Sequence, residues 1–169
     1  MNQQTHLMLW DQMRLRHGIA LRVIEQLPAD KLGAHPIAGM RTPLELIVHM
    51  YAGVKLFSES VLSGSVPKYD EKATVAGIQT KEQLLAFVAD AWAAGDKAAH
   101  AVTDAQLNGT VSTPWGAPFP GFAIFGIVND EYLHHRGQLY AFLRALGIEP
   151  VMLWDLEHSA PEYRPRQHA

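Results

Sequence analysis

The chain has 169 residues, of which 48% are apolar and 18% are charged, and its 14 basic and 17 acidic residues give a net charge of −3. This composition is typical of a globular protein with one sizeable core, and we expect a single domain over residues 1–169. The net negative charge and the lack of any long basic run argue against a nucleic-acid or anionic-membrane surface. The absence of cysteine excludes disulfides, thiolate metal ligands and a cysteine nucleophile.

The sequence shows neither a secretory signal nor a stretch long enough to span a membrane. The first residues, MNQQTHLMLWDQ, lack the basic-then-apolar pattern of a secretory signal. The longest apolar stretch, FAIFGIV, is far shorter than the roughly 20 residues that span a bilayer. We therefore expect a cytoplasmic protein that does not enter a membrane.

The first two helical patterns occupy the N-terminal part of the chain. The first covers about residues 3–27, where apolar residues recur at helical spacing, and it ends at Pro28. The second opens with Thr42, a favourable N-cap residue, and Pro43, which suits the first helical position. It continues through LELIVHMYAGVKLFSESVL to about residue 63.

Two further helical patterns follow. Thr80 and Gln83 have the spacing of a capping box and open a helix over about residues 81–104. The last pattern ends at Leu146, where Gly147 suits the C-terminal cap. Segments rich in glycine and proline separate the second, third and fourth helices, and we expect long loops there. Since no segment alternates convincingly as a strand, the sequence predicts an all-α protein, a four-helix bundle.

The last helix carries polar residues on its apolar face. At about 100° per residue, five apolar residues fall within about 40° of His135, namely Ile124, Val128, Leu139, Phe142 and Leu146. Glu131 lies on the same face one turn earlier, whereas His134 and Asp130 fall about 100° and about 140° away. We therefore expect Glu131 and His135 to point inward, and His134 and Asp130 to point outward.

A buried carboxylate requires a partner, and two interpretations supply one. A divalent cation would be held by the imidazole nitrogen of His135 and a carboxylate oxygen of Glu131. Alternatively, the pair forms a structural hydrogen bond, or the glutamate pairs with an arginine from another helix. His49, in the middle of the second helix, is a candidate third ligand because bundles build metal sites from inward side chains on facing helices. By itself, His49 also fits a hydrogen-bonded bundle histidine.

The histidine in PLELIVHM and the segment HHRGQLYAFLRALGIEP resemble the DinB/YfiT-like superfamily, and the resemblance covers nearly the whole chain. It implies a four-helix bundle, often a homodimer, with a divalent metal held by three side chains. One ligand is a second-helix histidine, which matches His49, and the other two form a His-x-x-x-His pair on the fourth helix. The second member of that pair matches His135, whereas Glu131 stands at the first position. The implied ligand set is therefore His49, Glu131 and His135, which suits zinc or nickel, and also iron or manganese.

The resemblance also implies an activity. Similar proteins include thiol-dependent S-transferases and a thiol-dependent isomerase, so we expect an S-transferase-like or hydrolase-like metal-dependent enzyme that acts on small molecules. Because the chain has no cysteine, the thiol would come from a low-molecular-weight cosubstrate. The alternative is a non-catalytic ligand-binding or interaction bundle whose metal site is structural or lost. DNA repair is not expected of this net-acidic chain.

Three side chains near the candidate site leave two interpretations each. Glu45, one turn before the second-helix histidine, either orients that ligand or acts as a base, or it is a solvated helix carboxylate. His134 is either a proton shuttle or an exposed or interface histidine. Trp115, with Phe119 and Phe122, either walls one end of a pocket or caps the core.

The sequence alone does not define where His17 and the C-terminal tail lie in the fold. His17 is on the first helix, from which it could approach the site. The tail from Trp154 to Ala169 either packs across a dimer or lies over the bundle.

Overall fold

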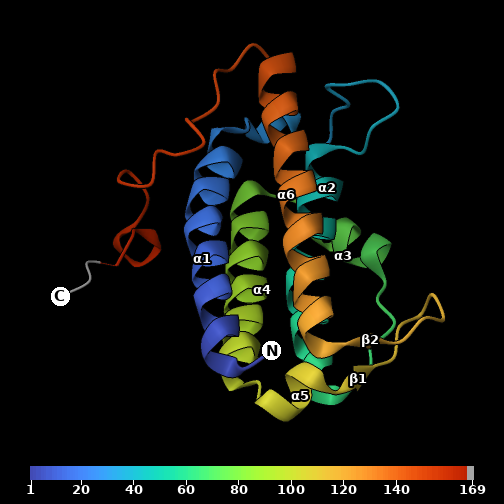
Figure 1. The fold of residues 1–169 in the computed structure, drawn as a ribbon. Coiled ribbons are helices and arrows are strands. Elements are labelled where there is room, and N and C mark those ends of the chain that lie inside the picture. The colour runs from blue at the N-terminus through green and yellow to red at the C-terminus, as the bar shows by residue number, and fades with distance from the viewer. Residues whose placement is uncertain (167–169) are drawn as a thin grey trace.

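The computed structural model describes residues 1–166, and four long helices dominate it (Figure 1). They are α1 (Gln3–Gln26), α2 (Pro43–Ser63), α4 (Lys81–Ala101) and α6 (Gly121–Ala145). These ranges confirm the predicted all-α bundle, with one shift at the end of the third helix. The helix ends at Ala101 because Val102 is extended and Thr103 caps the next element.

Short elements occupy the two segments predicted to be loops. They are α3 (Glu71–Gly77), α5 (Asp104–Asn108) and the antiparallel strands β1 (Thr110–Val111) and β2 (Phe119–Pro120). Two 3-10 turns lie elsewhere, η1 (Ala29–Lys31) between α1 and α2 and η2 (Pro161–Tyr163) after α6. The two predicted long connections are therefore present, and they contain short helices and a two-residue strand pairing that the sequence analysis did not identify. The Asp70 side chain accepts a hydrogen bond from the Ala73 backbone N–H, and a capping box at Thr103 and Gln106 opens α5.

Side-chain caps at two helix starts and a glycine after the last long helix account for the predicted bounds. Thr42 accepts a hydrogen bond from the Glu45 backbone N–H at the start of α2, and Thr80 does the same for Gln83 at the start of α4. Gly147 has a φ of 75°, the left-handed conformation that follows many helix ends and that glycine adopts without steric cost. These local signals explain why the helix bounds were predictable.

The core lies where α2 packs closely against both α4 and α6. Its largest fully buried side chains include Tyr51 on α2, Tyr132 and Phe142 on α6, and Leu84 on α4. Helix α1 joins the core mainly through large side chains, such as Trp10, whose ring stacks on that of Trp92 with centroids 5.5 Å apart. The packing leaves the middle of α2 facing the middle of α6.

Replacing Gly95 by alanine should destabilise the bundle by about 1–3 kcal/mol, because α2 and α4 approach closely there. A Cβ atom at this position would lie 2.8 Å from Val54 Cγ1 and 3.0 Å from the Val54 carbonyl oxygen. Urea denaturation would measure the change in the free energy of unfolding. The control is Gly126→Ala on α6, where a Cβ meets nothing within 4 Å and alanine favours the helix. A Gly95→Ala protein as stable as the unmodified chain would contradict the close contact.

The segment after α6 runs along α1 (Figure 1). Arg14 donates hydrogen bonds to the backbone carbonyls of Glu162 and Arg164, and Arg22 forms a 2.7 Å ion pair with Asp155. Of the two predictions for the tail, the one in which it lies over the bundle is confirmed for the described residues. The last residues of the predicted tail, 167–169, lie outside the described residues.

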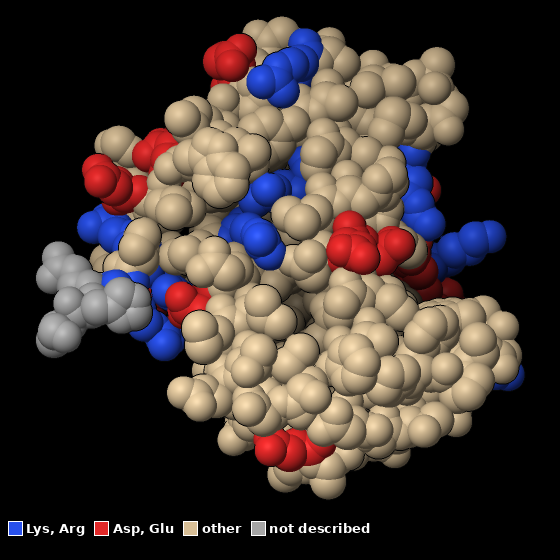
Figure 2. All heavy atoms as spheres, in the orientation of Figure 1, with Lys and Arg blue, Asp and Glu red and all other residues tan. Residues whose placement is uncertain are grey.

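The charge distribution agrees with the sequence analysis. Figure 2 shows one face of the molecule, on which basic and acidic side chains are interspersed in small groups without a continuous basic stripe. Among the described helices, none combines the length and the apolar character needed to cross a bilayer.

Candidate metal centre

Three predicted ligands come together between α2 and α6. His49 lies in the middle of α2, and Glu131 and His135 lie one turn apart on α6. One ligand atom from each residue lies within 4.8 Å of the other two, so this group could hold a metal ion. Glu131 Oε2 lies 3.0 Å from His135 Nε2 and 3.9 Å from His49 Nε2. The two imidazole rings are 4.9 Å apart and nearly perpendicular.

The burial of this group differs from the prediction in one respect. His135 is buried, with 8% of its surface exposed, as expected from the apolar face of α6. The Glu131 side chain is 50% exposed, so the prediction that it is buried was wrong. Its carboxylate faces an open cavity instead of a closed core. No burial penalty therefore forces the Glu131 carboxylate to find a partner.

The other ring nitrogen of His49 contacts Glu71 on α3. His49 Nδ1 lies 2.6 Å from Glu71 Oε2, and Arg41 pairs with the other Glu71 oxygen. Partial burial alone would raise the pKa of the Glu71 carboxyl, but hydrogen bonds from His49 and Arg41 outweigh it and hold that pKa below its usual value. Since an ionised carboxylate only accepts hydrogen bonds, His49 Nδ1 must donate. In a neutral ring, the Nε2 lone pair then faces Glu131.

His135 is oriented in a similar way from its own helix. Its Nδ1 lies 2.9 Å from Gln138 Oε1, which leaves Nε2 directed at Glu131. The Gln138 amide nitrogen lies 3.1 Å from His134 Nε2. His134 is exposed on the flank, as helical geometry predicted, and it is not one of the three clustered residues.

The donor set fits a divalent metal ion. Two imidazole nitrogens and one carboxylate oxygen are ligands of zinc and of other first-row divalent metals. Both histidines use Nδ1 for an acceptor partner, so both present Nε2 towards Glu131, as metal-binding histidines commonly do. At 3.9 Å, His49 Nε2 and Glu131 Oε2 are too far apart for a hydrogen bond. A cation between them would satisfy both atoms.

The three residues lie at the surface of a cavity of about 780 Å³, bounded by α2, α6 and two loop segments. This volume lies within the range of small-molecule sites, about 300–1,000 Å³. Its walls are mainly apolar and include Val54, Phe57, Val66, Trp115 and Val128. The Trp115 ring packs edge-on against Phe57 with centroids 6.0 Å apart, so Trp115 walls this pocket as one interpretation predicted. Lys68 and Tyr69 also line it.

Glu45 does not contact the candidate centre. Its carboxylate accepts hydrogen bonds from the Thr42 backbone N–H, at 2.8 Å, and from the Thr42 hydroxyl, at 3.1 Å. The backbone hydrogen bond is the main reason that the pKa of Glu45 is lowered. The interpretation of Glu45 as a base or as a partner of His49 was therefore wrong, because the carboxylate caps α2.

His17 lies in the core of the bundle, away from the candidate ligands. Its Nδ1 lies 2.9 Å from the Tyr51 hydroxyl, and its ring stacks on Trp92 with centroids 4.0 Å apart. Burial lowers the pKa of His17 to about 3. The structure therefore places this histidine as a neutral core residue.

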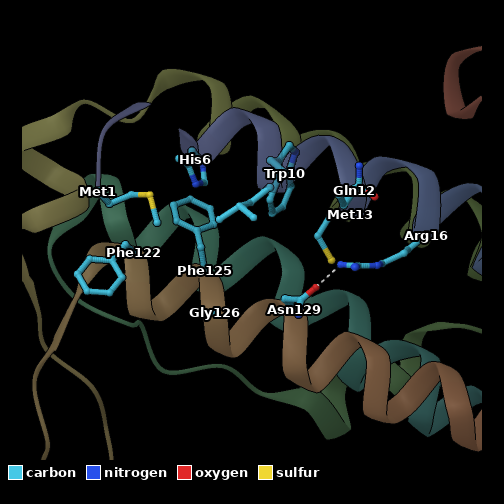
Figure 3. Close-up of a pocket in the computed structure, with 11 residues that line it drawn as sticks. Met1, His6, Trp10, Gln12, Met13, Arg16, Phe122, Phe125, Gly126 and Asn129 are labelled. Carbon is cyan, nitrogen blue, oxygen red and sulfur yellow. Dashed lines mark hydrogen bonds between the residues drawn. The ribbon is translucent and has the colours of Figure 1, made fainter. Parts of the chain in front are cut away.

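A second, smaller cavity of about 250 Å³ lies between α1 and α6 (Figure 3). Phe122 lines it together with His6, Trp10 and Phe125, so the prediction that Phe122 joins Trp115 at one pocket was wrong. Among the described residues, the group at His49, Glu131 and His135 is the one cluster of three potential metal-ligating side chains. Within its lining, Arg16 donates a hydrogen bond to the side-chain oxygen of Asn129.

The helical bundle and its His–Glu–His group define the class of protein. The DinB superfamily profile matches residues 10–139, and the chain belongs to this superfamily. A comparison with curated proteins gives no match.

Three solved structures share the fold. A DinB-like protein from Bacillus subtilis is 17% identical, with a TM-score of 0.66 over 82% of this chain and 91% of that one. A mycothiol-dependent maleylpyruvate isomerase is 18% identical, with a TM-score of 0.64 over 86% of this chain and 68% of that one. A proposed member of the DinB family from Exiguobacterium sibiricum is 25% identical, with a TM-score of 0.58 over 87% and 97%.

The sequence analysis did not identify two residues that contact the candidate ligands. Glu71 contacts His49 from a segment predicted to be a loop, and no spacing in the sequence connects the two. Gln138 was noted only as part of the HRGQ segment, yet its spacing of three residues from His135 on one helix was a usable signal.

Proposed function

We propose that this protein is a metal-dependent enzyme in which His49, Glu131 and His135 hold a divalent ion. The observation that carries the proposal is the convergence of His49 Nε2, His135 Nε2 and Glu131 Oε2 at the surface of the large cavity. Zinc or nickel is the expected ion, and iron or manganese also suits these ligands.

An open cavity favours a catalytic site over a structural one. Structural zinc sites use four protein ligands, whereas catalytic sites use three and keep a position for substrate or water. Three ligands are available here, and the side chains of His49 and Glu131 are 34% and 50% exposed. A small molecule in the cavity therefore has access to the donor atoms.

The reaction that fits best is a thiol-dependent transfer, with hydrolysis as the related choice. A bound divalent ion would supply Lewis acidity, which lowers the pKa of a thiol or water and polarises a carbonyl group. The name of the mycothiol-dependent maleylpyruvate isomerase supports a low-molecular-weight thiol as cosubstrate. The apolar walls would bind the body of the second substrate and exclude water around the reacting groups.

The second candidate function is a ligand-binding bundle without catalysis. The 3.0 Å contact between Glu131 and His135 favours it, because a proton on His135 Nε2 would make this contact a hydrogen bond that pairs the two side chains without any metal. It leaves His49 Nε2 without a contact of hydrogen-bond length to Glu131, however, which is why we prefer the metal centre. The homodimer implied by the family resemblance stays a prediction.

The proposed enzyme is tested by comparing metal-free protein with protein reloaded with zinc, nickel, manganese or iron. Mycothiol or glutathione would be offered with apolar electrophiles, and thiol consumption would be followed over time. Simple esters would test hydrolysis in parallel. We expect at least one reloaded form to exceed the metal-free rate by about 100-fold or more, the scale of positioned acid–base or electrostatic catalysis. Equal rates with and without metal across the set would favour the binding bundle.

A further inference from the structure

We propose that Glu71 is a positioning residue that fixes the orientation and the tautomer of His49, so that Nε2 is the atom offered to the metal. This inference rests on the proposed metal centre and adds to it a residue that does not itself touch the ion. The contact that motivates it is the 2.6 Å hydrogen bond between His49 Nδ1 and Glu71 Oε2.

Glu71 reaches His49 from a separate part of the chain. It is the first residue of the short helix α3, whose start is held by a 2.9 Å hydrogen bond from the Ala73 N–H to Asp70. The four residues from Val66 to Tyr69 line the cavity immediately before it. Glu71 therefore connects one wall of the cavity to a candidate ligand on α2.

The two oxygens of Glu71 have different partners. One accepts from His49, and the other pairs with Arg41, which lies just before the N-cap of α2. The positive charge of Arg41 offsets the negative charge that Glu71 adds near Glu131. Both Glu71 oxygens are thus acceptors in this arrangement, since the arginine N–H can only donate and His49 Nδ1 faces the second oxygen.

This constraint selects one tautomer of His49. Free neutral histidine prefers the proton on Nε2, which would make that nitrogen a donor facing Glu131 and unable to bind a metal. The hydrogen bond to Glu71 holds the proton on Nδ1 instead. A charged acceptor also forms a stronger hydrogen bond than a neutral one, and it increases the basicity of the nitrogen that faces the metal.

The orientation of His49 depends on Glu71 more than the orientation of His135 depends on Gln138. The His49 side chain is 34% exposed at the cavity, whereas that of His135 is 10% exposed and packed within α6. Glu71 is the residue that hydrogen-bonds the His49 ring at this exposed edge, so its loss removes the contact that fixes which nitrogen faces the cavity. His135 keeps Gln138 on its own helix.

The first test reads the tautomer without any metal. The ¹⁵N chemical shifts of His49 would be recorded by NMR at about pH 8, a pH above the ordinary histidine pKa, on the metal-free protein, on Glu71→Ala and on Glu71→Gln. We expect a protonated Nδ1 in the unmodified chain and a shift towards protonated Nε2 in Glu71→Ala. Glu71→Gln should keep part of the Nδ1–H form because its amide oxygen still accepts. The same His49 tautomer in all three proteins would overturn the proposal.

The second test measures zinc affinity by competition with a chelator. Loss of a hydrogen-bonding partner of a metal ligand weakens binding about 10–100-fold, so we expect this loss in Glu71→Ala and a smaller one in Glu71→Gln. The control is Glu59→Gln, which removes the same charge from α2 at a position that does not line the cavity. Circular dichroism would confirm that each variant is folded.

The outcomes separate this inference from the proposed function. Tight zinc binding by the unmodified chain with equal affinity in Glu71→Ala would overturn the role of Glu71 and leave the metal centre standing. Absence of binding of zinc, nickel, manganese and iron in the unmodified chain would overturn the metal centre, and the NMR comparison would still decide whether Glu71 sets the tautomer.

Discussion

His135→Ala is expected to weaken zinc binding by more than about 100-fold, because it would remove a proposed direct ligand and not only a partner of one. Of the three candidate ligands, His135 is the most buried and is held by both Glu131 and Gln138. Two remaining ligands, His49 and Glu131, would bind zinc only weakly. Chelator competition would measure the affinity, and circular dichroism would verify the helical content.

The matched control for this prediction is His134→Ala on the same helix. His134 is adjacent in sequence but exposed on the flank, and it contacts Gln138 instead of the donor cluster. Its removal should change zinc affinity by less than about threefold, because substitutions of exposed side chains usually have small energetic effects. Similar losses of zinc affinity in the two variants would contradict the proposal that His135 binds the metal and His134 does not.

The second large effect is an acid-dependent loss of stability that arises from His17. In the folded chain, burial lowers the pKa of His17 to about 3, whereas in the unfolded chain it returns to its ordinary value of about 6.5. Between these values the unfolded state binds a proton that the folded state does not, so the free energy of unfolding falls as the pH falls. From pH 7.5 to pH 5 the loss amounts to about 2 kcal/mol.

Urea denaturation of metal-free protein at pH 7.5 and at pH 5 would measure this loss. His6 contributes in the same direction, since burial lowers its pKa as well. The comparison protein is His17→Gln, whose side chain does not titrate and whose amide can still bond the Tyr51 hydroxyl. We expect His17→Gln to be less stable at pH 7.5 but to lose less stability on acidification. An unchanged dependence on pH in this variant would show that His17 is not the titrating group.

The bundle was predictable because its helices carry local signals that tertiary contacts did not override. Thr42 followed by Pro43, and Thr80 with Gln83, mark helix starts that the structure reproduces. The Thr103 and Gln106 pair is a third capping box of the same kind, and it could have predicted α5 and the earlier end of α4. The two-residue strands had no comparable signal, because so short a pairing depends on where the flanking helices bring the chain.

The candidate site was predictable in part. Helical geometry separated His135 from His134 correctly, since the angle between adjacent residues does not depend on the rest of the fold. The exposure of Glu131 was not predictable in this way, because a helical projection gives a direction and not what fills the space ahead. The contact between Glu71 and His49 could not be predicted for a related reason, since it depends on the path of the segment between α2 and α4.

The metal content of protein purified without a polyhistidine tag tests directly whether His49, Glu131 and His135 hold a divalent ion. We would compare the unmodified chain with Glu131→Ala and with Asp130→Ala, which removes the adjacent exposed carboxylate. We expect close to one divalent ion per chain in the unmodified protein and in Asp130→Ala, and little or none in folded Glu131→Ala. An unmodified chain that holds no metal, and that takes up none of zinc, nickel, manganese or iron, would contradict this expectation and leave Glu131 and His135 as a structural polar contact.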